Sequence, residues 1–179
     1  GGAVLTGNGG DVHVDAESLN LSGGSIIGTV SPVGETGGVI RVDAGTVNLE
    51  DGSIRTVAAG GAGGEVFIGG EVFRASGGTL QSLSFPNEAG NGRAGAVTIA
   101  MSESINGEKN QFIDAASFGD GGLSPVTLKA ATVVLDGLDI AECHDVTPED
   151  WLPAALPLAA PRFGGVRARG KLRARVSAG

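Results

Sequence analysis

The 179-residue sequence has few aromatic residues and almost no cysteine. It contains no Tyr, one Trp and six Phe, which disfavours a core built on large aromatic side chains. The single cysteine, Cys143, cannot form an internal disulfide. No apolar run reaches the ~18 residues that a transmembrane helix needs. Hydrophobic residues nevertheless make up 41% of the chain. We therefore expect a folded protein whose core consists of small and β-branched residues.

Acidic side chains outnumber basic ones, and the two kinds are unevenly distributed. The formal net charge of −8 argues against binding to nucleic acid or to anionic membranes. Residues 1–140 hold 16 acids and 6 bases, whereas residues 141–179 hold 4 acids and 6 bases. The six bases of the second segment all lie between Arg162 and Arg175. This change in composition predicts a folded region over 1–140 and a distinct tail over 141–179.

A glycine- and valine-rich segment recurs along the chain. Gly9–Ala16 returns 28 residues later as Gly37–Ala44, and a third copy begins at Gly64, with looser copies near Gly95 and Gly122. Apolar residues alternate within each copy, which predicts short half-buried strands. One such unit cannot bury its apolar side alone, but stacked copies can. The repeat therefore predicts an all-β parallel β-solenoid of about five coils.

Stacking should place equivalent residues of successive coils in columns about 4.8 Å apart. A β-sandwich would need hairpin turns every 8–12 residues and offers no reason for a 28-residue register. A third column holds mostly small residues, which predicts a tight corner. The two inward columns expected are Val12, Ile40, Val66, Val97, Val126 and Val14, Val42, Ile68, Ile99, Leu128; the small column is Ala16, Ala44, Gly70 and Ala130, with Met101 in the fourth coil.

The sequence pattern of these repeats resembles that of a family of bacterial exoproteins. The sequence GGDVHVDA, followed by LNLSGGSI and a loop that ends in Gly-Gly, is similar to the repeats of filamentous-haemagglutinin-like proteins over about residues 7–140. The resemblance implies a right-handed parallel β-helix, exported by two-partner secretion and acting as an adhesin or surface fibre. It implies a secreted or cell-surface location, glycans or receptors on host or neighbouring cells as partners, and an outer-membrane secretion partner. The secretion domain of the family is not in this sequence, which we expect to be a piece of a longer chain.

Asp15 and Asp43 are the strongest catalytic candidates. Both should lie on the outside of neighbouring coils at equivalent positions, about 5 Å apart, which is the separation used by retaining glycosidases. A carbohydrate-active β-helix enzyme, a polysaccharide hydrolase or lyase, is therefore the alternative function. Asp11 and Glu65 share another column but are separated by Val39. Because no aromatic platform for a sugar accompanies these acids, we expect a solvated polar surface and no enzyme activity.

Three other motifs are weaker. Gly60–Phe67 partly fits a calcium-binding nonapeptide but occurs once, and Gly90–Gly95 fits GxGxxG but precedes a strand where dinucleotide binding needs a helix. Glu142–Asp145 collects Glu, Cys, His and Asp in adjacent positions, where their side chains diverge. We expect turns at all three places, and neither a metal nor a cofactor. The sequence identifies no ligand-binding residue.

The tail differs from the repeats in its chemistry. Four prolines, from Pro148 to Pro161, end the strand pattern and predict an irregular cover or linker. We expect residues 148–163 to fold over the last coil, so that the strand of Val133 and Leu135 is covered by Trp151 and by at least one of Leu152, Leu156 and Phe163. The segment Arg167–Arg175 has a base at every second residue and is expected to be a solvated terminus, or else an anion-binding strand.

Overall fold

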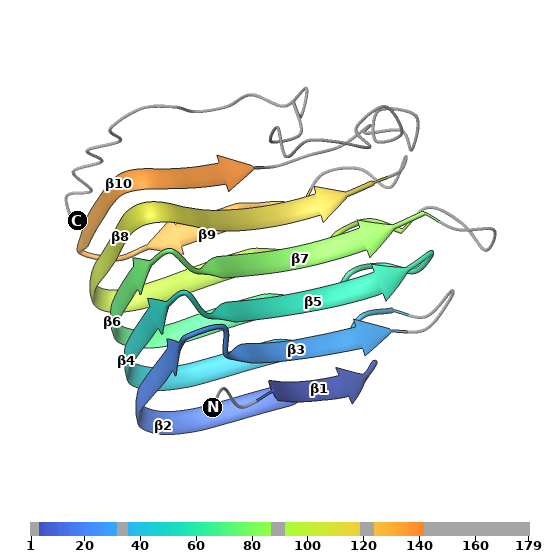
Figure 1. The fold of residues 1–179 in the computed structure, drawn as a ribbon, viewed down its shortest axis with the longest axis horizontal. Helices are drawn as coiled ribbons and strands as arrows, with labels where there is room; N and C mark the ends of the chain where they lie inside the picture. Colours follow the sequence, from blue (N-terminus) through green and yellow to red (C-terminus); the bar gives the residue numbers. More distant parts are fainter. Residues whose placement is uncertain (1–3, 32–35, 87–91, 119–123, 142–179) are drawn as a thin grey trace.

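The computed structural model describes residues 4–31, 36–86, 92–118 and 124–141. Within these residues the chain is all-β, with ten strands and no helix. Parallel pairing stacks the strands into a β-solenoid of about four turns, which confirms the predicted fold class (Figure 1). The strands are β1 (Val4–Asn8), β2 (Val12–Ser22), β3 (Ile26–Ser31), β4 (Ile40–Glu50), β5 (Ser53–Ala59), β6 (Val66–Ser76), β7 (Thr79–Phe85), β8 (Val97–Ser117), β9 (Val126–Lys129) and β10 (Thr132–Ala141).

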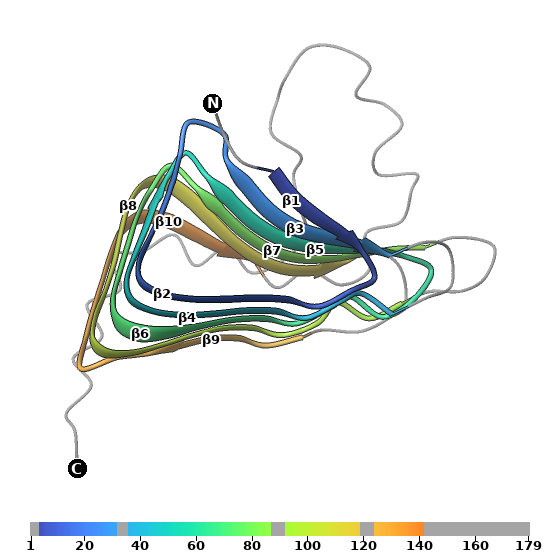
Figure 2. The same cartoon turned by 90° about the horizontal axis from the view of Figure 1, so that it is seen from below.

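Each coil has three sides, and the cross-section of the solenoid is triangular (Figure 2). Each 11-residue strand bends at its middle and contributes to two sides. Face one consists of residues 12–16, 40–44, 66–70, 97–101 and 126–129; face two of 18–22, 46–50, 72–76, 104–108 and 132–136; face three of 4–8, 26–31, 53–59, 79–85, 112–117 and 138–141.

The solenoid is right-handed. Viewed from the end that carries β1, the chain passes along β2 and then β3 in a clockwise direction as it moves away from the viewer (Figure 2). This hand agrees with the right-handed connection that parallel strands adopt almost without exception. The handedness implied by the sequence resemblance is therefore confirmed.

The predicted columns are confirmed by the strand register. Val12 pairs with Ile40, Ile40 with Val66, and the pairing continues through Val97 to Val126. The second column is in register as well, and the central members of both are fully buried. Burial rises from the first coil to the middle ones because only a middle coil has a neighbour on both sides. The core is thus one continuous stack of aliphatic side chains.

The fourth coil departs from the repeat through local insertions. The register shifts between Gly70 and Val72, where one extra residue of β8 is accommodated, and again where β10 passes Asp136. β8 runs without interruption from face one to face three, whereas β6 and β7 are separate strands. The extra residues that blurred the repeat in the sequence are therefore absorbed in bulges and a longer strand.

The column of small residues lies inside, at the first corner. Ala44 is 4% exposed and pairs with Gly70, whose φ is +156°. A Cβ atom on Gly70 would lie 1.7 Å from the carbonyl oxygen of Ala44, so only glycine permits this approach. Met101, the one large member of the column, is also buried.

Face three has a polar interior that the alternating pattern does not reveal. Thr29, Thr56 and Ser82 are fully buried in one column. The hydroxyl of Thr29 donates a hydrogen bond to the carbonyl oxygen of Gly38 at 3.2 Å. The hydroxyls of Thr56 and Ser82 both donate to the carbonyl oxygen of Gly64, at 2.8 and 2.7 Å. A second column repeats the arrangement: Ser31 donates to Thr36, Ser84 to Gly61 and Ser117 to Gly92. These hydroxyls hold the chain at the third corner, between face three and face one.

Replacing Ala44 by leucine should destabilise the protein by about 1–3 kcal/mol, because the larger side chain overpacks a closed corner. Urea unfolding of Ala44→Leu measures the loss. Ala100→Leu is the matched control, since Ala100 lies on the outer side of face one and is only half-buried. Equal stability of the wild type and Ala44→Leu would contradict the tight corner.

Thr29→Val should also destabilise, by about 1–3 kcal/mol, because it preserves the shape of the side chain and removes the donor to a buried carbonyl oxygen. Thr98→Val, on the outer side of face one, should stay within ~0.5 kcal/mol of the wild type. If both variants behave alike in urea unfolding, the buried hydroxyls are not what holds the third corner.

Candidate functional site

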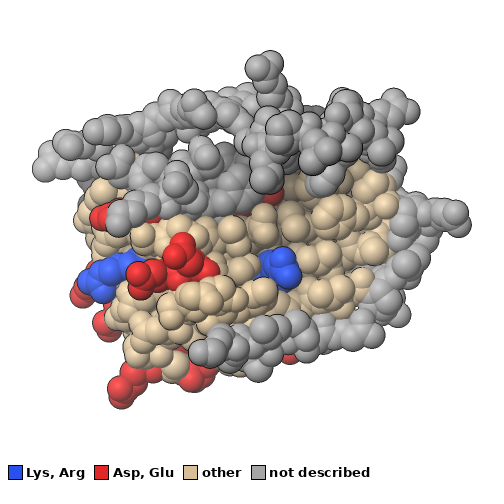
Figure 3. Space-filling model, in the orientation of Figure 1, with Lys and Arg blue, Asp and Glu red and all other residues tan. Residues whose placement is uncertain are grey.

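The charged side chains are unevenly spread over the solenoid. Figure 3 looks onto face three and shows few charged side chains over β3, β5 and β7, whereas acidic and basic groups meet near the corner with face two. Two other surfaces gather polar groups: the outer side of face one, which holds the predicted acidic pair, and the third corner. A third polar feature is a single buried carboxyl, Asp114, on face three.

Asp15 and Asp43 are direct strand partners, as the sequence predicted. Asp43 is already engaged by its neighbours. Its Oδ2 atom accepts a hydrogen bond from Arg41 Nε at 2.6 Å, its Oδ1 accepts one from Arg41 Nη2 at 3.0 Å, and His13 Nε2 lies 3.2 Å from Oδ2. The hydrogen bonds from Arg41, helped by that from His13, hold the pKa of Asp43 below its usual value. Asp43 is therefore a carboxylate fixed in an exposed ion pair.

An aromatic side chain adjoins this cluster. The Arg41 guanidinium carbon lies 4.5 Å from the centroid of the Phe67 ring, so Arg41 is held between Asp43 and Phe67. A Cβ atom on Gly69 would lie 2.9 Å from that ring, which packs closely over the strand. The sequence argument, which found no aromatic platform, missed this ring. Its exposed surface is shared with the guanidinium, and the arrangement is that of a small surface ion-pair cluster.

The column of Asp11 and Glu65 is interrupted by Val39, as the sequence predicted. Asp11 Oδ1 accepts a hydrogen bond from the backbone nitrogen of Val39 at 2.8 Å and so supports the next coil. Glu65 lies one coil beyond Val39, at the third corner. Asp11 thus has a structural role in the start of face one.

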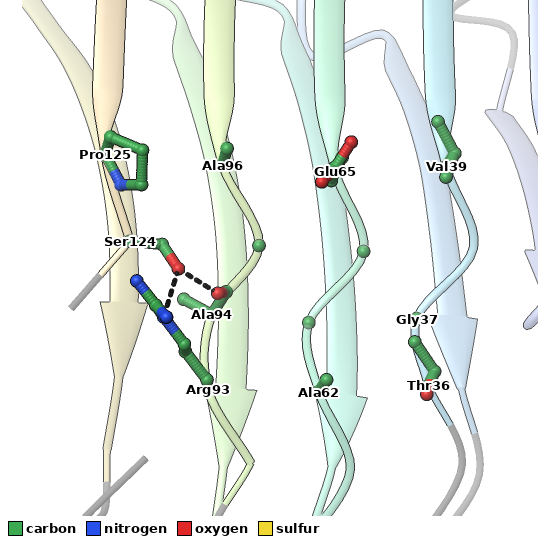
Figure 4. A pocket seen from close by; sticks show the side chains of 13 residues that line it. Thr36, Gly37, Val39, Ala62, Glu65, Arg93, Ala94, Ala96, Ser124 and Pro125 are labelled. Atoms are coloured by element: carbon green, nitrogen blue, oxygen red, sulfur yellow. Dashed lines mark hydrogen bonds between the residues drawn. The ribbon is translucent and has the colours of Figure 1, made fainter. Parts of the chain in front are cut away.

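An open pocket of about 580 Å³ lies along the third corner. Its walls come from four successive coils, and its floor is made of glycine and alanine (Figure 4). Small residues are needed there because successive coils approach each other closely. A Cβ atom on Gly64 would lie 1.9 Å from the carbonyl oxygen of Gly38. The larger side chains along the pocket are Thr36, Val39, Glu65, Arg93, Ser124 and Pro125.

Arg93 is the basic group of this corner pocket whose side chain is held by a residue of the next coil. Its Nε atom donates to Ser124 Oγ at 3.0 Å, and the buried Ser124 hydroxyl donates in turn to the carbonyl oxygen of Ala94. Figure 4 shows the guanidinium beside Ser124, with Glu65 farther along the row. In the described part of the chain, Arg93 forms no ion pair. The side chain is therefore oriented through Nε, and among the described residues its terminal nitrogens have no partner that would compete with an anion.

Asp114 is a buried carboxyl that the sequence analysis did not single out. It is 5% exposed, and its Oδ1 atom has no hydrogen-bond partner among the described residues. Burial raises the pKa of Asp114 to about 7. By strand alternation its side chain points away from the core, since Ile113 and Ala115 on either side belong to the core cluster. The only sequence signal was an acidic residue between two core positions.

Some of the sequence predictions concern residues outside the described part of the chain. Among the described residues, no group of three His, Cys, Asp or Glu side chains is placed to hold a metal ion, and no helix is long and apolar enough to cross a membrane. Glu142–Asp145, the basic segment Arg167–Arg175 and the cover predicted over 148–163 lie outside them. Gly60–Gly64 and Gly95 form corners that lead into β6 and β8, as expected of turns.

Comparisons with family models, with curated proteins and with solved structures found no match.

The raised pKa of Asp114 predicts that stability depends on pH. The folded protein binds the proton more tightly than the unfolded chain, so this contribution is fully present below about pH 4 and is lost as the pH rises through about 7. Asp114→Asn should flatten the fall in unfolding free energy between pH 5 and pH 8, and should stabilise the protein at pH 8 by up to a few kcal/mol. Urea unfolding at several pH values measures both. Parallel pH profiles for wild type and variant would show that Asp114 is solvated in the folded protein.

Proposed function

We propose that this chain is a non-catalytic segment of an exported bacterial surface β-solenoid that serves as an adhesin or a fibre stalk. The observation that carries the proposal is the in-register stacking of a repeat that resembles those of filamentous-haemagglutinin-like proteins. A solenoid of this kind lengthens by adding coils, since each new coil pairs along its whole length with the previous one. Such a rod holds its far end away from the surface to which the protein is attached. It also presents equivalent side chains repeatedly along its length.

The proposal places the protein outside the cell, secreted or attached to the cell surface, with an outer-membrane partner recruited through a domain not in this sequence. Its ligands are glycans or receptors on host or neighbouring cells. The corner pocket is the surface that we assign to such a ligand. It spans four coils, so it suits an extended chain, and its oriented Arg93 suits an anionic group on that chain.

A polysaccharide hydrolase or lyase acting through Asp15 and Asp43 is the second candidate. The direct pairing of these residues favours it. Against it, both oxygens of Asp43 are bound by Arg41. A glycosidase pair also needs a second carboxyl that is protonated to act as general acid. The hydrogen bonds from Arg41 lower the pKa of Asp43, which disfavours the protonated form that a general acid needs.

We expect the chain to release no reducing ends from a panel of anionic and neutral polysaccharides. A reducing-sugar assay on the wild type, with Asp15→Asn and Asp43→Asn as paired variants, tests this. If the wild type releases reducing ends and either substitution abolishes this release, the protein is an enzyme and the stalk proposal is wrong.

A binding assay distinguishes an adhesin, which has a ligand, from a stalk that has none. With immobilised anionic polysaccharides, we expect Arg93→Gln to weaken binding about tenfold, the effect of one charged hydrogen bond. Arg74→Gln is the control, because Arg74 is an exposed base on face two, away from the pocket. Equal weakening by both variants would indicate nonspecific charge attraction, and a wild type that binds no polysaccharide of the panel would leave the stalk as the function.

A further inference from the structure

The outer side of face three carries apolar residues in strand register. Val30 pairs with Val57, Val57 with Leu83, and Leu83 with Ala116. Beside this column the rings of Phe85 and Phe118 stack, with centroids 4.7 Å apart. Face three therefore carries apolar residues on its outer side as well as on its inner side, where one aliphatic column stacks beside the buried hydroxyls: Ile27, Ile54, Leu80 and Ile113. We call these six residues the outer apolar strip: Val30, Val57, Leu83, Phe85, Ala116 and Phe118.

Burial rises along the strip toward its C-terminal end. Val30 is 48% exposed, Leu83 is half-buried and Ala116 is 1% exposed. Asp114, on the same strand and also pointing outward, is 5% exposed. Strand neighbours flank an outward side chain but do not lie over it. The strip is therefore buried at its C-terminal end and open at its N-terminal end.

The chain leaves the described structure next to this buried end. β10 ends at Ala141, which is the strand partner of Asp114 on face three. Residues 142–179 follow. The nine residues before Trp151 can span up to about 30 Å when extended, whereas the strip from Ala116 to Val30 crosses three strand spacings, about 14 Å. The tail thus starts next to the strip and is long enough to cross it.

The composition of the following segment fits an apolar sheet surface. Residues 151–163 read WLPAALPLAAPRF, with Arg162 as the one charged residue. Prolines in this segment withhold backbone donors, so it can cover strands without presenting a new pairing edge. An uncovered strip of this kind would otherwise be a surface for association.

We propose that the outer apolar strip is the docking surface of this chain's own segment 151–163, with Trp151 packed against face three. The segment then covers the side of the solenoid, next to the point where the chain emerges. This differs from the cover over Val133 and Leu135 expected from sequence, which would close the end of the core.

Trp151 is the only tryptophan of the chain, so its fluorescence reports directly on docking. In the 179-residue chain we expect a blue-shifted emission protected from acrylamide. Leu83→Lys should shift the emission to that of the denatured chain and remove the protection, while the far-UV circular dichroism stays that of the wild type. Thr98→Lys, at a half-buried outer position of face one, should change neither. A solvent-exposed Trp151 in the wild type, or equal effects of the two variants, would overturn the proposal.

A second measurement does not require the fold to tolerate a lysine at position 83. A short-range quencher attached to Leu83→Cys, in a Cys143→Ser background, should quench Trp151, and the same label on Thr98→Cys should not. Stronger quenching from Val134→Cys, on the last coil, would assign the segment to the end of the solenoid. Quenching that grows with protein concentration, together with a dimer in analytical ultracentrifugation, would assign it to a second copy. Either result overturns docking in cis on face three.

Discussion

Lateral hydrogen bonding between equivalent strands is the constraint on which the rest of this structure depends. Because every strand pairs in parallel with the same segment of the next coil, each residue lies directly above its counterpart. An inward position must then suit the same environment in every coil, which explains why aliphatic residues stack on aliphatic ones. The constraint also acts on the outside, where Asn48 donates a hydrogen bond to Asn20 at 2.7 Å and Thr79 to Ser53 at 2.8 Å. A substitution at one position therefore changes the packing of the coils on both sides.

The corners complete this arrangement by different means. At the first corner, small residues allow coils to approach, and Gly70 lies against the carbonyl oxygen of Ala44. At the third corner, buried hydroxyls of face three hold the glycine-rich connections through their carbonyl oxygens. A buried carbonyl oxygen without a donor is costly, so these hydroxyls are a condition for folding the connection inward. The same corner produces the pocket, because glycine and alanine leave space where the neighbouring strands carry larger side chains.

The chemistry of the outer side of the solenoid is our reason for proposing binding and not catalysis. A stacked column repeats one chemistry, whereas an active site needs groups with different protonation states held close together. Asp15 and Asp43 are adjacent, yet Arg41 fixes Asp43 as an exposed carboxylate. The buried carboxyl, Asp114, lies on another face. The arrangement supplies extended, repetitive contact surfaces, and Arg93 in the corner pocket is the one basic group there that another coil orients.

The sequence by itself determined the repeat, the parallel stacking and the two inward columns of face one, because alternation and a 28-residue register both follow directly from strand geometry. It also determined that Asp15 and Asp43 would be neighbours. Only the tertiary structure decided what those positions do. Arg41 precedes Asp43 by two residues, and alternation places both on the outer side, but their bidentate contact depends on side-chain rotamers. The buried hydroxyls of Thr29 and Thr56 resemble surface residues in the sequence, and their acceptors lie in connections eight or nine residues away. Asp114 and Arg93 acquire their properties from segments brought together only by coiling, which no local pattern records.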